Sequence, residues 1–272
     1  MSMQVTTPSG VVISVTVEGS GPPLMLITGT GDDYTRYARV SPILAQSYTL
    51  YNVDRRGRGS STDAPSHAFL DEVHDMLAVI DAIEAEAGPV NMLAHSYGGL
   101  VGLETAWRTD KLKSVLLYEP PMPLYERIDG VDPRKPLVVT MAEILAKGDI
   151  DGVITFYLSD FMGSSSETVE RQKSNPKAWE RWRSMARTVP RELMIVRDYE
   201  FAPFKFVSVK YPVGVLVGGK SRPGMRRAAE RIKSGIPQTK IIELPGEGHS
   251  AMTSSPEMFA SAVLAFLNSA NR

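Results

Sequence analysis

The chain has 272 residues, of which 43% are hydrophobic, with a formal net charge of −1 and no cysteine. A charge this close to zero gives no electrostatic basis for binding nucleic acid or an anionic membrane surface. The absence of cysteine excludes disulfides, a thiol nucleophile and thiolate metal sites, and it fits a reducing compartment.

The start of the chain lacks the basic-then-apolar pattern of a signal peptide, and the longest apolar runs are too short to span a bilayer. We therefore expect a cytoplasmic protein that needs no cofactor and acts on a small molecule, with no nucleic acid or membrane as partner. The sequence leaves open whether it forms a homodimer.

Short apolar runs alternate with helical patterns over the first 121 residues, which predicts parallel strands joined by crossover helices. The expected strands are 11–17, 24–27, 48–53, 90–94 and 112–118. The expected helices are 34–45, 69–83 and 100–107. Pro120 and Pro121 prevent a regular continuation after the strand at 112–118.

The rhythm changes after residue 121. Only helical patterns follow, at 138–145, 150–162, 169–185 and 192–196; strands then return at 213–217 and 240–244, with helices at 222–232 and 256–268. This predicts an α/β fold with a mostly parallel central sheet flanked by helices and a helical cap insertion. Residues 1–121 and 207–272 form the expected core domain, and residues 122–206 the expected cap.

The segment Ala94-His95-Ser96-Tyr97-Gly98 lies where a strand runs directly into a helix. Such a turn holds a serine in a strained conformation and exposes its hydroxyl, provided that the residues two before and two after it are small. Alanine departs from the usual glycine at the first of these positions, but it is still small. Ser96 is therefore the candidate nucleophile, the alternative being a serine that only caps the helix. His95 should point to another side and have a structural role.

The chain has four histidines, without metal-ligand spacing. His67 and His74 are expected to be solvated. His249 follows the last expected strand in Gly246-Glu247-Gly248-His249, at the same sheet edge as Ser96. A histidine in that place can accept the serine proton and return it to a leaving group; the alternative is a loop histidine with no role.

In sites of this type, the acid lies between the serine and the histidine along the chain. It usually follows the strand at 213–217, but Ser221 stands there instead of an aspartate. Glu119 ends the strand at 112–118 and is stiffened by two prolines, so it is the candidate acid. The alternatives are Asp160 or Asp198 from the cap, Glu247, which is expected to face solvent, or no acid at all.

A tetrahedral intermediate needs two N–H donors. The backbone of Tyr97 should supply one, and Thr30 the other, because Gly29 and Gly31 let the backbone approach a ligand closely. The basic run at 54–61 could be a phosphate loop, but it lacks the lysine of that motif, so we interpret it as a structural turn.

Taken together, Thr28-Gly29, Asp54-Arg55-Arg56-Gly57-Arg58-Gly59, the serine turn and Gly246-Glu247-Gly248-His249 resemble the α/β-hydrolase superfamily. The Glu-Pro-Pro setting of Glu119 resembles the members whose acid follows the sixth strand, zearalenone lactonases among them. The resemblance implies that the cap covers the pocket and sets specificity. A serine nucleophile argues against epoxide hydrolases and haloalkane dehalogenases, which use aspartate there.

The expected cap is rich in aromatic residues and methionine. Tyr157, Phe161, Met162 and Trp182 are the candidate substrate-binding residues, although each could equally pack in the interior of the cap. We expect a hydrolase that cleaves a hydrophobic carboxylic ester or lactone through an acyl-enzyme on Ser96. The alternatives are a cofactor-free lyase, isomerase or cyclase, a carbon–carbon bond hydrolase, and a ligand-binding protein without turnover.

Overall fold

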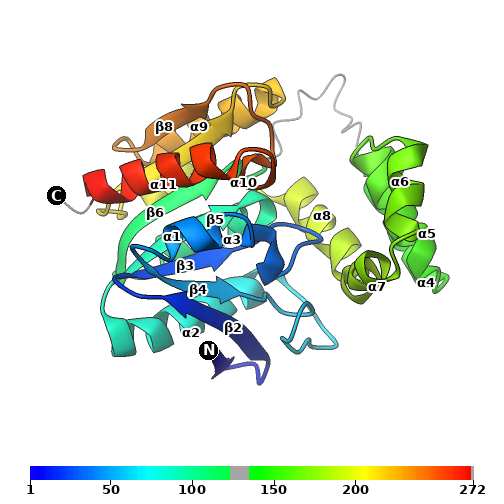
Figure 1. Cartoon of the computed structure of the whole chain (residues 1–272), viewed down its shortest axis with the longest axis horizontal. Coiled ribbons are helices and arrows are strands. Elements are labelled where there is room, and N and C mark those ends of the chain that lie inside the picture. Colours follow the sequence, from blue (N-terminus) through cyan, green and yellow to red (C-terminus); the bar gives the residue numbers. More distant parts are fainter. Residues whose placement is uncertain (123–134, 271–272) are drawn as a thin grey trace.

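A twisted sheet forms the centre of the molecule (Figure 1). The computed structural model describes residues 1–122 and 135–270. The strands are β1 (Ser2–Thr6), β2 (Val12–Gly19), β3 (Pro23–Ile27), β4 (Thr49–Val53), β5 (Val90–His95), β6 (Leu112–Tyr118), β7 (Val213–Gly218) and β8 (Lys240–Leu244). Their order is β1-β2-β4-β3-β5-β6-β7-β8. Only the pairs that involve β1 and β2 are antiparallel among the described strands.

Helices cover both faces of this sheet. The flanking helices are α1 (Ser41–Leu44), α2 (Phe69–Ala87), α3 (Ser96–Ala106), α9 (Pro223–Gly235), α10 (Ala251–Ser254) and α11 (Pro256–Ala270). One buried cluster joins the sheet to α2, α3 and α9, and a second joins it to α1, α10 and α11. Within β3, Met25 and Ile27 belong to the first cluster and Leu24 and Leu26 to the second, as the two-residue period of a strand requires. The predicted fold class is confirmed.

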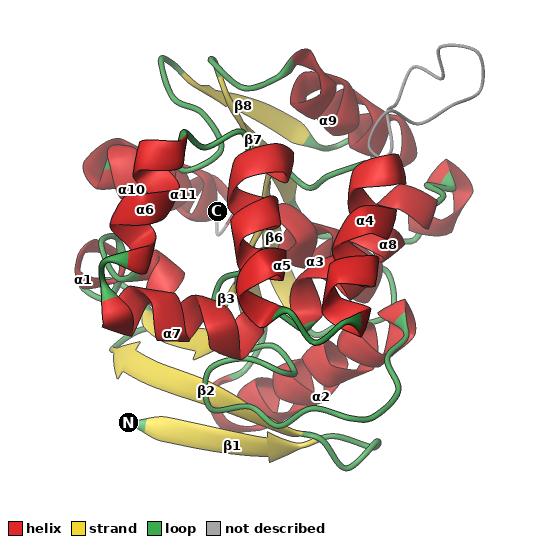
Figure 2. Ribbon diagram, turned by 90° about the vertical axis from the view of Figure 1, so that its right-hand side faces the viewer, coloured by secondary structure: helices red, strands yellow, loops and turns green. Residues whose placement is uncertain are grey.

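A group of helices stands between β6 and β7 along the chain. These inserted helices are α4 (Lys135–Ala146), α5 (Ile150–Phe156), α6 (Ser166–Lys173), α7 (Pro176–Met185) and α8 (Thr188–Asp198). Of these, α4, α5, α7 and α8 contribute to a hydrophobic cluster of their own. Figure 2 shows them in front of the sheet. The stretch 123–134, the first part of the predicted cap, lies outside the described residues.

Two expectations about secondary structure were wrong, and one strand was not foreseen. The helix expected at 34–45 is two short pieces, a 3₁₀ turn at Tyr34–Tyr37 and α1, because Pro42 cannot donate a helical hydrogen bond. The helix expected at 169–185 is broken into α6 and α7 before Pro176. Strand β1 was not expected; it is short and lies at the edge of the sheet.

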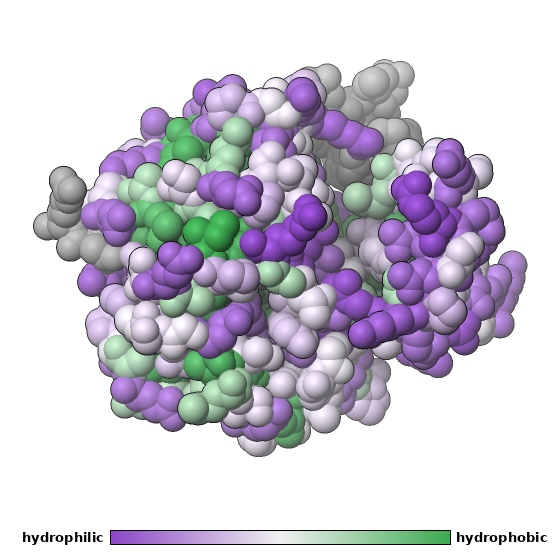
Figure 3. All heavy atoms as spheres, in the orientation of Figure 1, coloured by the Kyte–Doolittle hydropathy of each residue, from purple (hydrophilic) through white to green (hydrophobic). Residues whose placement is uncertain are grey.

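The surface mixes polar and apolar side chains on the face shown in Figure 3. No helix within residues 1–122 and 135–270 is both long and apolar enough to cross a membrane.

Candidate active site

Ser96 lies at the junction of β5 and α3. Its φ is +53°, in the left-handed region that residues with a side chain rarely adopt. Gly98 is required there, because a Cβ at this position would lie 2.2 Å from the carbonyl oxygen of Thr28. The next residue of the same loop, Gly29, packs against the serine itself, where a Cβ would lie 2.8 Å from that of Ser96. The serine turn therefore packs tightly against the loop after β3, which a larger residue at position 98 would prevent.

Glu119 is strained in the same way, with φ +46°. Among the described residues, Ser96 and Glu119 are the only non-glycine residues with positive φ. The Glu119 amide still donates to the Leu216 carbonyl of β7 at 3.1 Å, and the side chain is fully buried. Strain of this kind costs about 1–3 kcal/mol per residue and is concentrated at functional sites. Its occurrence at these two positions marks them as a candidate site.

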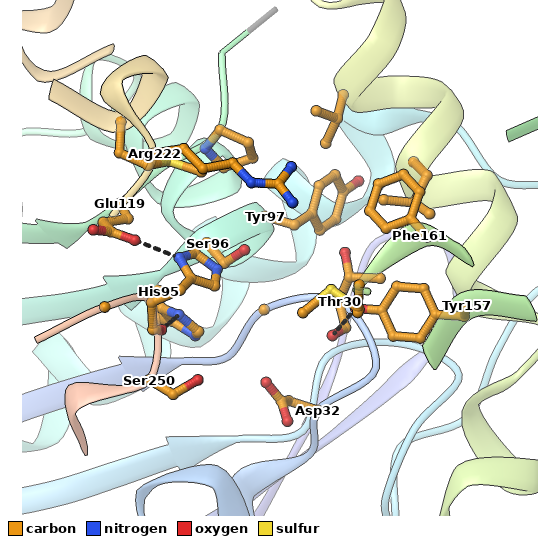
Figure 4. A pocket seen from close by; sticks show the side chains of 18 of the residues that line it. Thr30, Asp32, His95, Ser96, Tyr97, Glu119, Tyr157, Phe161, Arg222 and Ser250 are labelled. Atoms are coloured by element: carbon orange, nitrogen blue, oxygen red, sulfur yellow. Dashed lines mark hydrogen bonds and ion pairs between the residues drawn. The ribbon is translucent and has the colours of Figure 1, made fainter. Parts of the chain in front are cut away.

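The Glu119 carboxylate binds the ring of His249 (Figure 4). Oε2 lies 2.6 Å from Nδ1, and Oε1 accepts a hydrogen bond from the Gly218 amide at 2.7 Å. Burial by itself raises the pKa of Glu119, but the bond with His249, together with smaller contributions from Ser221 and the Gly218 amide, outweighs it and the pKa is lowered. The carboxylate is thus ionised and holds a proton on Nδ1, which leaves Nε2 free to accept one.

The loop that carries His249 is fastened by its backbone. The Tyr118 hydroxyl donates to the Gly248 carbonyl and accepts from the Ala251 amide. Nε2 of His95 donates to the His249 carbonyl at 3.0 Å, and the two rings lie 4.6 Å apart. Burial holds the pKa of His95 well below its usual value, so this ring is neutral. His95 therefore supports the loop, in agreement with the structural role expected for it.

Ser96 and His249 line the same cavity. Within the described residues, no hydrogen bond joins the Ser96 hydroxyl to the ring. Hydrogen bonds between catalytic groups are often long until a substrate is bound, so this geometry is compatible with proton transfer between the two residues.

Of the candidate carboxylates, the structure brings only Glu119 to the His249 ring. The others bond elsewhere: Asp160 to Ser159, Asp198 to Arg197, and Glu247 to Ser254 and Ser255. Ser221, where an aspartate was expected, lies beside Gly218: a Cβ on that glycine would be 2.8 Å from its hydroxyl. The Gly218 amide also binds Glu119. A carboxylate at position 119 and one at position 221 would therefore occupy neighbouring space.

The basic run at 54–61 is a structural turn whose arginines are buried. The side chains of Arg55 and Arg58 are 0% exposed, and they pair with Glu72 of α2 and Glu192 of α8, which are at most 1% exposed. Nε2 of His67 lies 2.9 Å from Glu72, so the expectation that this histidine is solvated was wrong. The sequence pattern did not single out either glutamate, because each becomes a partner only through the tertiary fold.

This buried cluster also holds the loop after β3. Arg55 donates to the carbonyls of Thr28 and Gly29, both at 2.9 Å, and Arg58 donates to the Gly29 carbonyl at 3.1 Å. The carbonyl of Gly29 and the N–H of Thr30 belong to one trans peptide and point in opposite directions. The Thr30 amide is therefore turned away from the arginines.

Tyr97, the other expected donor, is held by the same cluster. Its hydroxyl donates to Glu72 at 3.0 Å, and the Arg55 guanidinium lies 4.8 Å from the centre of its ring. Its amide is in the first turn of α3, where N–H groups have no partner within the helix. Both amides expected to stabilise an oxyanion thus belong to segments fixed by the same buried charges.

A cavity of about 460 Å³ connects these groups. Its wall includes Ser96, His249, Glu119, Thr30 and Tyr97, together with Tyr157, Phe161, Met162 and Trp182 from the inserted segment. Trp182 packs on the loop after β3, where a Cβ on Gly31 would lie 2.7 Å from its ring. The Tyr157 hydroxyl lies 3.5 Å from the Thr30 carbonyl. All the site residues predicted from the sequence therefore meet at one cavity.

In the part of the chain that the structure describes, no group of three His, Asp or Glu side chains that could hold a metal ion occurs.

Two curated relatives match part of the chain. The uncharacterized protein Rv2715 of Mycobacterium tuberculosis is 32% identical over 120 residues, which cover 43% of this chain and 34% of that protein. The fluoroacetate dehalogenase of a Burkholderia species is 31% identical over 128 residues, or 44% of this chain and 41% of the dehalogenase. The matched stretch thus spans about a third of the length of the first relative and two fifths of the second.

The whole fold has close counterparts among solved structures. The crystal structure of an alpha/beta hydrolase from Sphaerobacter thermophilus superposes with a TM-score of 0.81 and 26% identity, over 97% of this chain and 100% of that one. The profile of the alpha/beta hydrolase family matches residues 24–262. This match covers most of the chain, both strained residues and the histidine loop. The chain belongs to the alpha/beta hydrolase family.

Proposed function

We propose that the protein is a serine hydrolase that cleaves a carboxylic ester or lactone of a hydrophobic small molecule through an acyl-enzyme on Ser96. The observation that carries this proposal is the 2.6 Å bond between His249 and a buried, strained Glu119, beside a strained serine in the same cavity. This is the arrangement of nucleophile, base and acid that acyl transfer requires.

In the proposed reaction, His249 Nε2 takes the Ser96 proton as the Oγ atom attacks the substrate carbonyl carbon. The amides of Tyr97 and Thr30 stabilise the oxyanion that forms. Collapse of this intermediate breaks the bond to the leaving oxygen, which receives the proton from Nε2. Water then attacks the acyl-enzyme by the same route and releases the acid. Glu119 stays ionised throughout and stabilises the imidazolium at each step.

The cavity wall favours a hydrophobic substrate. Three aromatic rings lie together in this wall. The ring centre of Tyr157 is 5.8 Å from that of Phe161 and 5.9 Å from that of Trp182. Apolar walls with a few fixed polar groups are typical of sites for small organic molecules. The serine separates this chain from dehalogenase chemistry, since haloalkane dehalogenases use an aspartate nucleophile.

A fluorophosphonate probe tests the proposal directly. The wild-type protein should be labelled on Ser96, whereas folded Ser96→Ala should not be labelled and should lose ester turnover by about 10³-fold or more. Pre-steady-state release of a chromogenic alcohol from an activated ester should show a burst of one equivalent per site. Labelling without a burst would favour the lyase or isomerase alternative. If a Ser96→Ala variant with native circular dichroism kept over a tenth of the activity, the assignment would be wrong.

A further inference from the structure

Among the described residues of the cavity wall, one arginine has no ion-pair partner. The charged residues that line the cavity are Asp32, Arg36, Glu119, Arg197, Lys220 and Arg222. Arg36 donates to Ser250 at 2.7 Å and lies 3.4 Å from Asp32. Arg197 pairs with Asp198. The pKa of Glu247 is lowered mainly by the hydrogen bonds from Ser254 and Ser255, and to a smaller extent by the positive charge of Lys220.

Arg222 differs from the other two arginines of the cavity wall, Arg36 and Arg197, which each have an acidic partner. Among the described residues, its guanidinium makes no hydrogen bond and no ion pair within 4.0 Å. It is the residue before α9, in the loop that leaves β7 beside Ser221. Figure 4 shows the guanidinium directed into the cavity, toward the side occupied by Tyr97 and Phe161. An arginine placed in this way offers its donors to whatever fills the cavity.

We propose that Arg222 binds a carboxylate of the substrate, so that the preferred substrate is an acidic ester or lactone with a hydrophobic portion. This inference rests on the proposed hydrolase function and narrows its substrate class. A planar guanidinium binds a carboxylate through two parallel hydrogen bonds, and it is always charged at physiological pH. The aromatic rings of the inserted helices would contact the rest of the molecule, while Arg222 fixes its charged end and thereby its direction relative to Ser96.

The effect should be moderate in size, because Arg222 is more than a third exposed and water screens the pair. We expect a preference of about tenfold in kcat/KM, which corresponds to about 1.4 kcal/mol. The preference should shrink as salt is added, since exposed charges are screened at high ionic strength.

Two substrates with the same skeleton measure this preference: the 4-nitrophenyl hemiester of a short dicarboxylic acid, and its methyl-capped neutral analogue. The readout is the ratio of their kcat/KM values. In the wild-type protein the ratio should favour the acid about tenfold, and Arg222→Gln should bring it close to one. Arg222→Lys should keep part of the preference, because it retains the charge but not the paired donors.

Arg226→Gln is the matched control. Arg226 lies in the first turns of α9, four residues after Arg222, and carries the same charge, but it pairs with Glu230 and Glu243 and is not among the residues that line the cavity. This variant should keep the wild-type ratio. A wild-type ratio at or below one, or equal changes in the two glutamine variants, would overturn the proposal.

A binding measurement separates this proposal from the hydrolase proposal. Calorimetry with Ser96→Ala needs no turnover: it should show the hemiester binding about tenfold more tightly than the neutral analogue. Ser96→Ala combined with Arg222→Gln should lose that difference. If the wild-type protein reacts with neither substrate nor a fluorophosphonate but the binding difference is present, only the hydrolase proposal fails. If turnover is present and the binding difference is not, only the role of Arg222 fails.

Discussion

Replacing Glu192 by glutamine should both destabilise the protein and slow its chemistry. Glu192 is a residue of α8, and its two carboxylate oxygens contact Arg55 and Arg58 across the boundary between the inserted helices and the sheet. The arginines in turn hold the carbonyls of Thr28 and Gly29. Without the negative charge of Glu192, the buried guanidiniums of Arg55 and Arg58 keep only Glu72 as a carboxylate partner among the described residues.

The size of the loss follows from burial. All three side chains are 0% exposed, and removing one partner of such a pair costs about 3–5 kcal/mol, because the remaining charge is uncompensated. Burial, together with the like charge of Arg55, already lowers the pKa of Arg58. For a chain of this length, each kcal/mol shifts Tm by about 2–4 °C, so Glu192→Gln should lower Tm by about 6–20 °C.

Catalysis should fall separately from stability. A displacement of about 1 Å in the loop that carries Thr30 can cost about 10²-fold in rate. We expect kcat to fall by about 10- to 100-fold at 20 °C, where the variant is still folded, with a much smaller change in KM. A boronic acid inhibitor, which forms a tetrahedral adduct with the serine, should bind more weakly in proportion to the loss of kcat. Thermal unfolding by circular dichroism and inhibition constants provide the measurements.

Arg191→Gln is the control on the adjacent position. It breaks the Arg191–Asp63 pair, whose side chains are 18% and 34% exposed, and it should cost at most about 1 kcal/mol. Replacing both Glu192 and Arg58 by apolar residues of similar size should restore much of the stability, but not kcat, since the Gly29 carbonyl loses its bond from Arg58 and keeps only the one from Arg55. If the Tm of Glu192→Gln were within 2 °C of that of the wild-type protein and its kcat within twofold, the reasoning would be refuted.

Four further predictions concern the site. Glu119→Ala should lower kcat by about 10²- to 10⁴-fold, and adding Ser221→Asp should recover part of it, because both positions open onto the same space; near-normal kcat in the single variant would remove Glu119 from the mechanism. kcat/KM should rise from acid to neutral pH, since a general base must be unprotonated to take the serine proton and the lowered pKa of Glu119 keeps that carboxylate ionised; a flat profile over this range would contradict the proposed role of His249. The same lowered pKa makes Glu119 stabilising above its unfolded pKa of about 4.3, and this contribution is lost as pH falls through the folded value. Acid unfolding of Glu119→Gln should therefore depend less on pH than that of the wild-type protein. Trp182→Ala should change the relative rates of small and large esters more than it changes Tm, and a variant that unfolds with unchanged selectivity would place this ring in the core.

The fold could be predicted from the sequence because the parallel strands are continuous apolar runs, bounded by turn residues. The positions of Ser96, Glu119 and His249 followed from the ends of these strands. Since parallel strands end at one edge, residues just after them converge even when they are far apart along the chain. The three side chains accordingly line one cavity.

Other features depend on contacts between distant elements. Nothing in the pattern of α8 distinguishes Glu192 from a solvated glutamate, and its burial follows from the docking of the inserted helices. The same holds for His67, a histidine of a polar loop that meets Glu72 only in the folded chain. The prediction of one helix at 34–45 was wrong for a local reason. Its apolar period continues across Pro42, but proline has no backbone N–H to donate to the preceding turn, and the helix is interrupted there.

The docking of the His249 loop has a consequence for biosynthesis. His95 and His249 are separated by 154 positions, and Glu119 and His249 by 130. A nascent chain that has emerged through Glu119 already contains Ser96, but it lacks the proposed base, His249, until β8 has paired and its loop has docked. Recovery of activity after denaturation will therefore follow the closure of the last part of the sheet rather than the formation of the first strands. Half-made chains on the ribosome should be unable to cleave esters.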